Sequence, residues 1–336
     1  MKFSTRVLAI LVALFSITVT VTAQSLTRDD LQKFYDINEF IARKHPPRQV
    51  IDSLLATLPT ATTTITVADM APLFDETMPM LLISKAVDGL YLTDGLRQGV
   101  DLDSARDAVS FTTLYPFRRP NERDYRKLFD VFSVDCPPLH RAYLEKIPFM
   151  LRNSGPSEHT ARLRELIAAN VAESPLKQSA MQVLDSFLPL APGSKAPEVT
   201  LLDENARECS LSSFKGKTVV VDVWATWCHN CRKKMPDYLA MAKDYDPSRV
   251  VFLSLSIDKP ELREKWLEAS RKHSIPSATN LIVAPAADDK SNSPFEQIYC
   301  VGGVPRYIVI GSDGNIVDAF APGNLSELKT LIDSTL

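Results

Sequence analysis

Two cysteines separated by two residues, Cys228 and Cys231, are the side chains of this chain best suited to chemistry. An apolar run over residues 218–223 precedes them and a helical pattern follows, which predicts that a strand delivers Cys228 to the first turn of a helix. Unpaired backbone N–H groups and the positive end of the helix dipole stabilise a thiolate at that position. Cys231, one helical turn further on, can attack a mixed disulfide formed at Cys228 and release the product. The pattern therefore predicts a redox centre for protein disulfides.

Length and composition place this centre in an ordinary globular protein. The chain has 336 residues, which is long enough for two domains, and 45% of them are hydrophobic and 24% charged. The formal net charge is −3 and the basic residues form no long runs, which argues against a nucleic-acid partner. Five cysteines are too few for a small scaffold held by disulfides, and their odd number leaves at least one unpaired or paired with another molecule.

The N-terminus has the pattern of a secretory signal peptide. Lys2 and Arg6 precede an apolar stretch that ends in small residues, so we expect residues 1–23 to be removed by cleavage after Ala23. The alternative is an uncleaved single-pass anchor, which would keep the protein close to a membrane. Both interpretations predict a location outside the cytoplasm, in the periplasm or elsewhere in the bacterial cell envelope.

The segment that follows the signal is helical in pattern, because apolar residues recur at spacings of three and four. Ser174 and Pro175 supply an N-cap and a first-turn proline for its last helix. We expect a mostly α-helical N-terminal domain over residues 24–187 and a proline- and glycine-rich linker over residues 188–197. A docking module, a dimerisation element and a shield over the active site are all compatible with its composition.

Strands alternate with helices in the last part of the chain, residues 198–336. The expected helices cover residues 229–245 and 258–272, and a closing helix begins at Leu325. The expected strands cover residues 198–202, 218–223, 250–257, 280–283, 306–310 and 316–320. This order predicts a mixed sheet with helices on both of its faces.

Four signatures follow one another in this part of the chain: Ser210-Leu-Ser-Ser-Phe-Lys-Gly-Lys217, Val221-Asp-Val-Trp-Ala-Thr-Trp-Cys-His-Asn-Cys231, Pro236, and Tyr299-Cys-Val-Gly-Gly-Val-Pro305 followed by Asp313-Gly314. With them, residues 191–336 resemble the thioredoxin superfamily, and more closely its exported TlpA/ResA-like branch. The resemblance implies an α/β thioredoxin-like fold and an extracytoplasmic thiol–disulfide oxidoreductase without a cofactor. It also implies protein thiols and disulfides as clients and an upstream redox partner, such as a membrane electron donor.

The resemblance assigns the chemical roles to three residues. Cys228 matches the exposed attacking cysteine and Cys231 the buried resolving cysteine. Asp222, six residues before Cys228, matches the buried acid that assists deprotonation of the resolving thiol, and burial should raise its pKa. A capped or solvated aspartate at the end of a strand is the alternative interpretation of Asp222.

Further residues match the family's surroundings of the site. Trp227 matches an aromatic beside the active site, and Pro236 matches the kink proline of the active-site helix. Pro305 matches the cis-proline, beside which the backbone of Val304 can pair with an incoming peptide. The chain departs from its relatives at Val304, where ResA-like members often carry threonine, and at Ser254, where thioredoxin has a lysine near the buried acid.

His229 and Asn230 separate the two cysteines and are expected to tune the centre. A protonated imidazole at His229 would stabilise the Cys228 thiolate and make the disulfide more oxidising. Related exported proteins with reducing roles vary the same dipeptide, so the direction of electron flow stays open.

Other classes of protein fit less well. A thiol peroxidase usually has threonine three residues before the reactive cysteine, whereas position 225 is alanine and Thr226 is one place off. A thioredoxin-fold binding or scaffold protein tends to lose a cysteine, and both are present. A metal site at Cys228 and Cys231 would need two more ligands, and none is expected. The histidines of the helical N-terminal segment are scattered and are predicted to be surface or hydrogen-bonded side chains: His45, His140 and His159.

The three other cysteines leave two interpretations open. Cys209 and Cys300 both lie in the predicted thioredoxin-like domain and are candidates for a structural disulfide, which would leave Cys136 single. An accessory redox role for Cys300, five residues before Pro305, is the rival interpretation.

Overall fold

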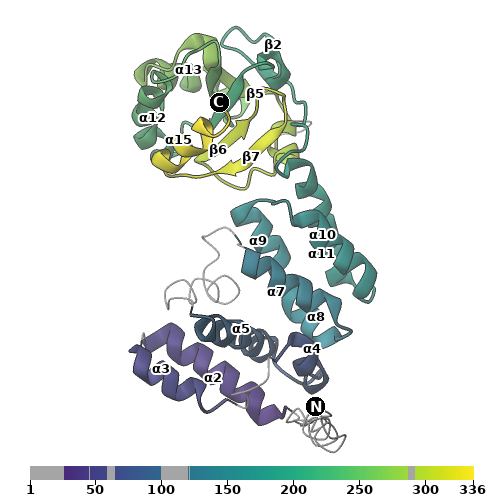
Figure 1. Ribbon diagram of the computed structural model, residues 1–336. Coiled ribbons are helices and arrows are strands. Elements are labelled where there is room, and N and C mark those ends of the chain that lie inside the picture. The colour runs from purple at the N-terminus through teal and green to yellow at the C-terminus, as the bar shows by residue number, and fades with distance from the viewer. Residues whose placement is uncertain (1–25, 45, 59–64, 100–119, 121, 287–291) are drawn as a thin grey trace, which may run out of the picture.

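The computed structural model describes residues 26–44, 46–58, 65–99, 120, 122–286 and 292–336. The predicted signal peptide and His45 lie outside these residues. Helices come first along the chain and a sheet with its covering helices comes last, as Figure 1 shows from purple to yellow. No helix among the described residues is both long and apolar enough to span a membrane.

The helical region, as we call the elements up to residue 187, is built from helices that bury apolar faces against one another. Helices α2 and α5 pack together, and α8 and α9 connect α5 with α11. Ser174 caps α11 as expected, because its side chain accepts the Lys177 N–H. The elements are α2 (Arg28–Lys44), α3 (Arg48–Leu55), α4 (Val67–Met70), η1 (Ala71–Leu73), α5 (Met80–Arg97), α7 (Glu122–Ser133), α8 (Pro137–Leu144), α9 (Lys146–Ser154), α10 (Thr160–Asn170) and α11 (Pro175–Phe187).

The catalytic region, as we call residues 188–336, is organised around a seven-stranded sheet in the order β2-β1-β5-β4-β3-β6-β7. Strand β3 pairs in parallel with β4 and antiparallel with β6, so the sheet is mixed as predicted. The strands are β1 (Leu201–Leu202), β2 (Glu208–Cys209), β3 (Thr218–Trp224), β4 (Val250–Ser256), β5 (Asn280–Val283), β6 (Arg306–Ile310) and β7 (Ile316–Ala321).

Both faces of this sheet are covered. Alternate residues of β3 enter two different apolar clusters, with Val221 on one face and Val220 on the other, because side chains of a strand alternate between faces. The thioredoxin-like fold preceded by a helical region is therefore confirmed. The covering elements are η2 (Leu188–Leu190), η3 (Leu211–Phe214), α12 (His229–Ala242), η4 (Pro260–Leu262), α13 (Arg263–Lys272), η5 (Ser277–Thr279), α14 (Pro294–Ile298) and α15 (Leu325–Asp333).

Several predicted element boundaries were wrong. The strand expected over residues 198–202 shrinks to β1, because a turn at Asp203 leads directly into the unpredicted strand β2. The helix expected to reach residue 245 ends at Ala242. Helix α14 was missed, although Ser293 and Glu296 form a capping box that is a recognisable start signal.

The stretch expected to be a linker lies against the sheet. Gly193 N–H donates to the Ile316 carbonyl oxygen at 2.8 Å, and Ile316 N–H donates to that of Ser194 at 2.7 Å. Next to it, Phe320 of β7 stacks on Phe187 of α11 with 5.7 Å between ring centroids. The helical and catalytic regions therefore meet at the end of β7, below the sheet in Figure 1.

Candidate active site

The two central cysteines lie where the buried strand β3 gives way to helix α12. Cys228 is the N-cap of α12, and its sulfur accepts the Cys231 N–H at 3.1 Å. Cys228 and Cys231 form a disulfide, with their Cα atoms 5.3 Å apart. A sulfur at Cys228 is thus placed where helix N–H groups stabilise negative charge.

The exposure expected for Cys228 is wrong for this disulfide form. Cys228 is 6% exposed and Cys231 is 1% exposed, so both are buried. The reason is local, since the bond to Cys231 and the hydrogen bond from its N–H turn the Cys228 sulfur towards the helix.

Asp222 lies in the middle of β3 and is sealed from solvent. Its residue is 1% exposed, and its Oδ1 has no hydrogen-bond partner among the described residues. Burial raises the pKa of Asp222 to about 8, against a lowering influence of the Lys234 ammonium. The solvated interpretation of Asp222 is wrong, and its carboxyl group can exchange a proton near neutral pH.

The charge that acts on Asp222 comes from the active-site helix. Ser254 lies directly beside Asp222 in the sheet, but its hydroxyl contacts the Met235 sulfur at 3.8 Å. Lys234 of α12 is half-buried and donates to the Gly323 carbonyl oxygen at 2.8 Å. Sequence reasoning missed Lys234, because only the fold brings α12 over Asp222.

The residues matched to client binding surround this centre. Trp227 is 64% exposed and directly precedes Cys228. The Val304–Pro305 peptide bond is cis, as the resemblance implies. Arg306, the next residue, pairs with Val223 of β3, which brings the loop before β6 to the same end of the sheet as Cys228.

The residues expected to tune the centre lie on α12. His229 and Asn230 are its first two residues, and both are exposed. Pro236 lies inside the helix, on its exposed side.

Asp258 is a part of the site that sequence reasoning missed. Its residue is 1% exposed, and its carboxylate accepts the Thr226 N–H at 2.7 Å and the Thr226 hydroxyl at 2.8 Å. The Ser256 hydroxyl donates to the same group at 2.6 Å. Asp258 therefore fixes the turn between β3 and Cys228. The aspartate after an apolar strand was a visible signal, but its partner lies 32 residues earlier in the chain.

The candidate bridge between Cys209 and Cys300 is absent, because both are free thiols, as is Cys136. Cys209 belongs to β2, which is an edge strand of the sheet. Cys300 lies near β6, five places away in the strand order, because Arg306 at the start of β6 donates a hydrogen bond to the Cys300 carbonyl oxygen. Burial raises the pKa of all three thiols, which favours their protonated form.

Two of these histidines, His140 and His159, have partners in the protein. His140 is buried and its Nε2 lies 2.8 Å from the Val134 carbonyl oxygen. His159 Nε2 lies 2.8 Å from a Glu122 carboxylate oxygen. His159, Glu122 and Glu158 form the one group of potential metal ligands found among the described residues, and both glutamates are exposed.

The catalytic region is similar in sequence to known proteins. The model of the AhpC/TSA family matches residues 192–319. Thiol-disulfide oxidoreductase ResA of Geobacillus thermodenitrificans is 30% identical over 128 residues, which are 38% of this chain and 67% of that relative. ResA of Bacillus anthracis is 27% identical over 126 residues, 38% of this chain and 67% of that relative. The solved thioredoxin domain of a Bacteroides vulgatus thiol-disulfide oxidoreductase is 28% identical, with a TM-score of 0.38, over 44% of this chain and 99% of that one.

The chain belongs to the thioredoxin-like family of thiol–disulfide oxidoreductases. Within this class the similarity is to the ResA proteins, as the motifs indicated. The family model begins at residue 192, after the helical region.

Proposed function

We propose that the protein is an extracytoplasmic enzyme that exchanges disulfides with protein clients through the Cys228-His229-Asn230-Cys231 centre. The observation that carries this proposal is a cysteine pair at the N-terminus of α12, together with a buried carboxyl group, Asp222, that has an unpartnered oxygen and lies on the strand leading into that helix. The two cysteines supply the nucleophiles, and the Asp222 carboxylate supplies a proton acceptor.

In the reducing direction, the Cys228 thiolate attacks one sulfur of a client disulfide. The client's S–S bond breaks, its other sulfur leaves as a thiolate, and a mixed disulfide with Cys228 remains. The Asp222 carboxylate then accepts the Cys231 proton, and the Cys231 sulfur attacks Cys228. This step releases the second client thiolate and leaves the Cys228–Cys231 disulfide, so the client gains the two electrons that the cysteine pair loses.

The cycle closes only when an upstream redox partner reduces the centre again, for which a membrane electron donor is suited. In the oxidising direction the same steps run backwards, and a client thiolate attacks Cys228. A predicted signal peptide over residues 1–23 supports export of the chain. The proposed domains are a helical domain over residues 24–187, a connection over 188–197 and the catalytic domain over 198–336.

Client contact is proposed for Trp227 and for the backbone of Val304 beside Pro305. An exposed indole offers an apolar platform, and an extended client segment can pair with the Val304 backbone as a short strand. His229 and Asn230 are proposed to tune the Cys228 thiolate from the exposed start of α12, and Pro236 to shape that helix.

The bonding of Thr226 favours disulfide exchange over peroxidase chemistry. Its hydroxyl donates to Asp258 at 2.8 Å, so it is engaged away from a peroxide bound at Cys228. Retention of both cysteines in one disulfide disfavours a pure scaffold.

Trapping of mixed disulfides tests the proposal. Cys231→Ser removes the resolving nucleophile and keeps Cys228, so covalent complexes with clients should accumulate in the envelope of an exporting bacterium. Cys228→Ser is the matched control and should trap almost none. Trapping by Cys228→Ser alone would reverse the two roles. Absence of complexes from both variants, with no disulfide exchange by the wild type, would reject the enzyme.

A further inference from the structure

Arg306 is a buried cation that the proposed chemistry does not use. It directly follows Pro305 and is 8% exposed. Its Nε donates to the Ala319 carbonyl oxygen at 2.8 Å, and its Nη1 donates to that of Cys300 at 2.9 Å. Burial lowers the pKa of Arg306 to about 10, so the guanidinium stays charged at neutral pH.

These hydrogen bonds close a loop. The loop runs from Cys300 to Pro305, and β6 begins at the next residue, Arg306. The hydrogen bond from Arg306 to the Cys300 carbonyl oxygen therefore joins the first residue of the loop to the start of β6. Cys300 has a φ of +50°, a left-handed conformation that a non-glycine residue rarely adopts without support. The guanidinium therefore fixes both ends of the segment that carries Val304.

The guanidinium is in turn positioned by an aromatic ring. Arg306 Cζ lies 3.6 Å from the centroid of the Phe320 ring, a close cation–π contact. On the helical side Phe320 stacks on Phe187, at 5.7 Å between centroids and 27° between ring planes. A Cβ atom at Gly155 would lie 2.3 Å from the same ring, so the chain after α9 also approaches it closely.

A second contact joins the helical region to the loop. The Cys300 thiol donates to the Ser186 carbonyl oxygen of α11 at 3.5 Å, across 114 residues of sequence. The last turn of α11 thus contacts the loop directly through Ser186 and indirectly through Phe187, Phe320 and Arg306.

We propose that the helical region sets the conformation of the 300–305 loop through Phe187, Phe320 and Arg306, and so selects which protein clients can pair with the Val304 backbone. Phe320 and Arg306 are positioning residues, because they act through the loop and lie apart from the two sulfur atoms. The inference rests on the proposed function, since it gives that site its means of client selection.

The test compares a protein client with a small one, using the full mature chain. Phe187→Leu removes the stacked ring but keeps apolar volume. Arg306→Lys keeps the charge but lacks the rigid planar fork whose Nε and Nη1 reach the two carbonyl oxygens. With dithiothreitol supplied as the reductant, each variant should raise KM for insulin about five- to tenfold. The kcat for insulin, the single-turnover rate of the pre-reduced protein with dithiobis(nitrobenzoate) and the reduction potential of the cysteine pair should stay unchanged. Phe40→Ala, on the distant helix α2, is the control and should change none of these.

Two results would overturn the inference: an unchanged KM for insulin in both variants, or an equal loss of activity on both substrates. Amide hydrogen exchange at residues 301–304 gives a readout that does not depend on activity. It should be about tenfold faster in Phe187→Leu than in the wild type, and unchanged exchange would also overturn the inference. A wild type that is inactive on both substrates would reject the proposed function, while the exchange data would still decide whether the helical region holds the loop.

Discussion

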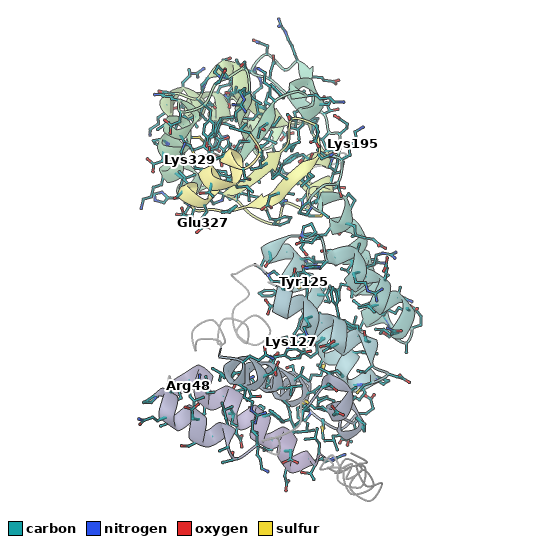
Figure 2. All side chains as sticks on the ribbon, in the orientation of Figure 1. Arg48, Tyr125, Lys127, Lys195, Glu327 and Lys329 are labelled. Atoms are coloured by element: carbon teal, nitrogen blue, oxygen red, sulfur yellow. A yellow bond between two sulfur atoms is a disulfide. The ribbon has the colours of Figure 1, made fainter. Side chains whose placement is uncertain are left out.

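The two regions of this protein bury a carboxyl group in opposite ways. In the helical region, Asp88 is 0% exposed and its Oδ1 accepts from the Lys127 ammonium at 2.7 Å, and the Tyr143 hydroxyl donates to the same oxygen at 3.2 Å. In the catalytic region, Asp222 is 1% exposed and its Oδ1 has no hydrogen-bond partner among the described residues. Lys127 and the helices around it are seen in Figure 2.

The difference separates a structural carboxylate from a reactive one. Lys127 and Tyr143 donate hydrogen bonds to Asp88 and so join α5, α7 and α8 into one unit. Asp222 lacks such support, so burial raises its pKa to about 8 and leaves it able to gain or lose a proton. Two equally buried carboxyl groups therefore serve different purposes: the one with hydrogen-bond partners joins helices, and the one with an unpartnered oxygen can exchange a proton.

The largest expected effect comes from Asp222→Asn on the chemical step. The variant should form the mixed disulfide at nearly the normal rate, but resolution by Cys231 should slow by roughly 10²–10⁴-fold, the usual cost of losing a general base. Rapid-mixing measurement of client release from a preformed mixed disulfide checks this. Asp237→Asn, on the exposed side of α12, is the control and should resolve normally. Normal resolution by Asp222→Asn would remove Asp222 from the mechanism.

The same variant should have the opposite effect on stability. Because the pKa of Asp222 is raised to about 8, its contribution is fully present below the ordinary aspartate pKa and is lost as pH rises through about 8. Asp222→Asn should therefore be more stable than the wild type at pH 8, by roughly 3–5 kcal/mol, and nearly equal to it at pH 4. Urea unfolding of both oxidised proteins at the two pH values measures the difference.

Asp88→Ala should instead destabilise the protein. It removes the Asp88 carboxylate, whose Oδ1 lies 2.7 Å from the ammonium of the buried Lys127. Breaking a buried pair from one side costs about 3–5 kcal/mol. Chemical denaturation should show this loss, and the double variant Asp88→Leu, Lys127→Met should recover much of it. Exchange of a small disulfide should be unaffected in the folded fraction. A loss of exchange chemistry in Asp88→Ala would break the distinction between the two carboxyl groups.

Asp258→Asn sharpens the comparison within the catalytic region, since Asp258 is a buried carboxylate that has partners. The asparagine amide cannot accept all three hydrogen bonds, from the Thr226 N–H, the Thr226 hydroxyl and the Ser256 hydroxyl. We therefore expect the free energy of unfolding to fall by about 1–3 kcal/mol. The reduced protein should also show a changed alkylation rate at Cys228, because the preceding turn is less well held. Glu268→Gln, exposed on α13, should change neither quantity.

The smallest effect is expected from Lys234→Met. The Lys234 ammonium lowers the pKa of Asp222, so its removal should raise that pKa further. The pH midpoint of client release should move upwards, by less than about one pH unit, since the ammonium is half-exposed and screened by solvent. Lys233→Met, its exposed neighbour, is the control. A downward shift would contradict the assignment of the midpoint to Asp222.

Much of the catalytic region could be predicted because its signals are local. Strand β6 covers Arg306–Ile310 as predicted, and β3 extends the predicted run by one residue, since each is a short apolar run between turn residues. The short elements were not predictable with the same certainty. Strands β1 and β2 have two residues each, too few for alternation to show.

The sequence by itself determined the position of the cysteine pair at a strand–helix junction, the mixed sheet and the helical character of the first region. These features depend on periodicity, capping and turn residues, which act over a few neighbouring positions. Tertiary structure alone decided which side chains meet: Asp258 with Thr226, Lys234 with Asp222, and Arg306 with Phe320 and, beyond it, the helical region. Such contacts join elements that are distant in sequence. They exist only once the sheet and helices have packed, because packing fixes which groups are buried together and which are left without a partner.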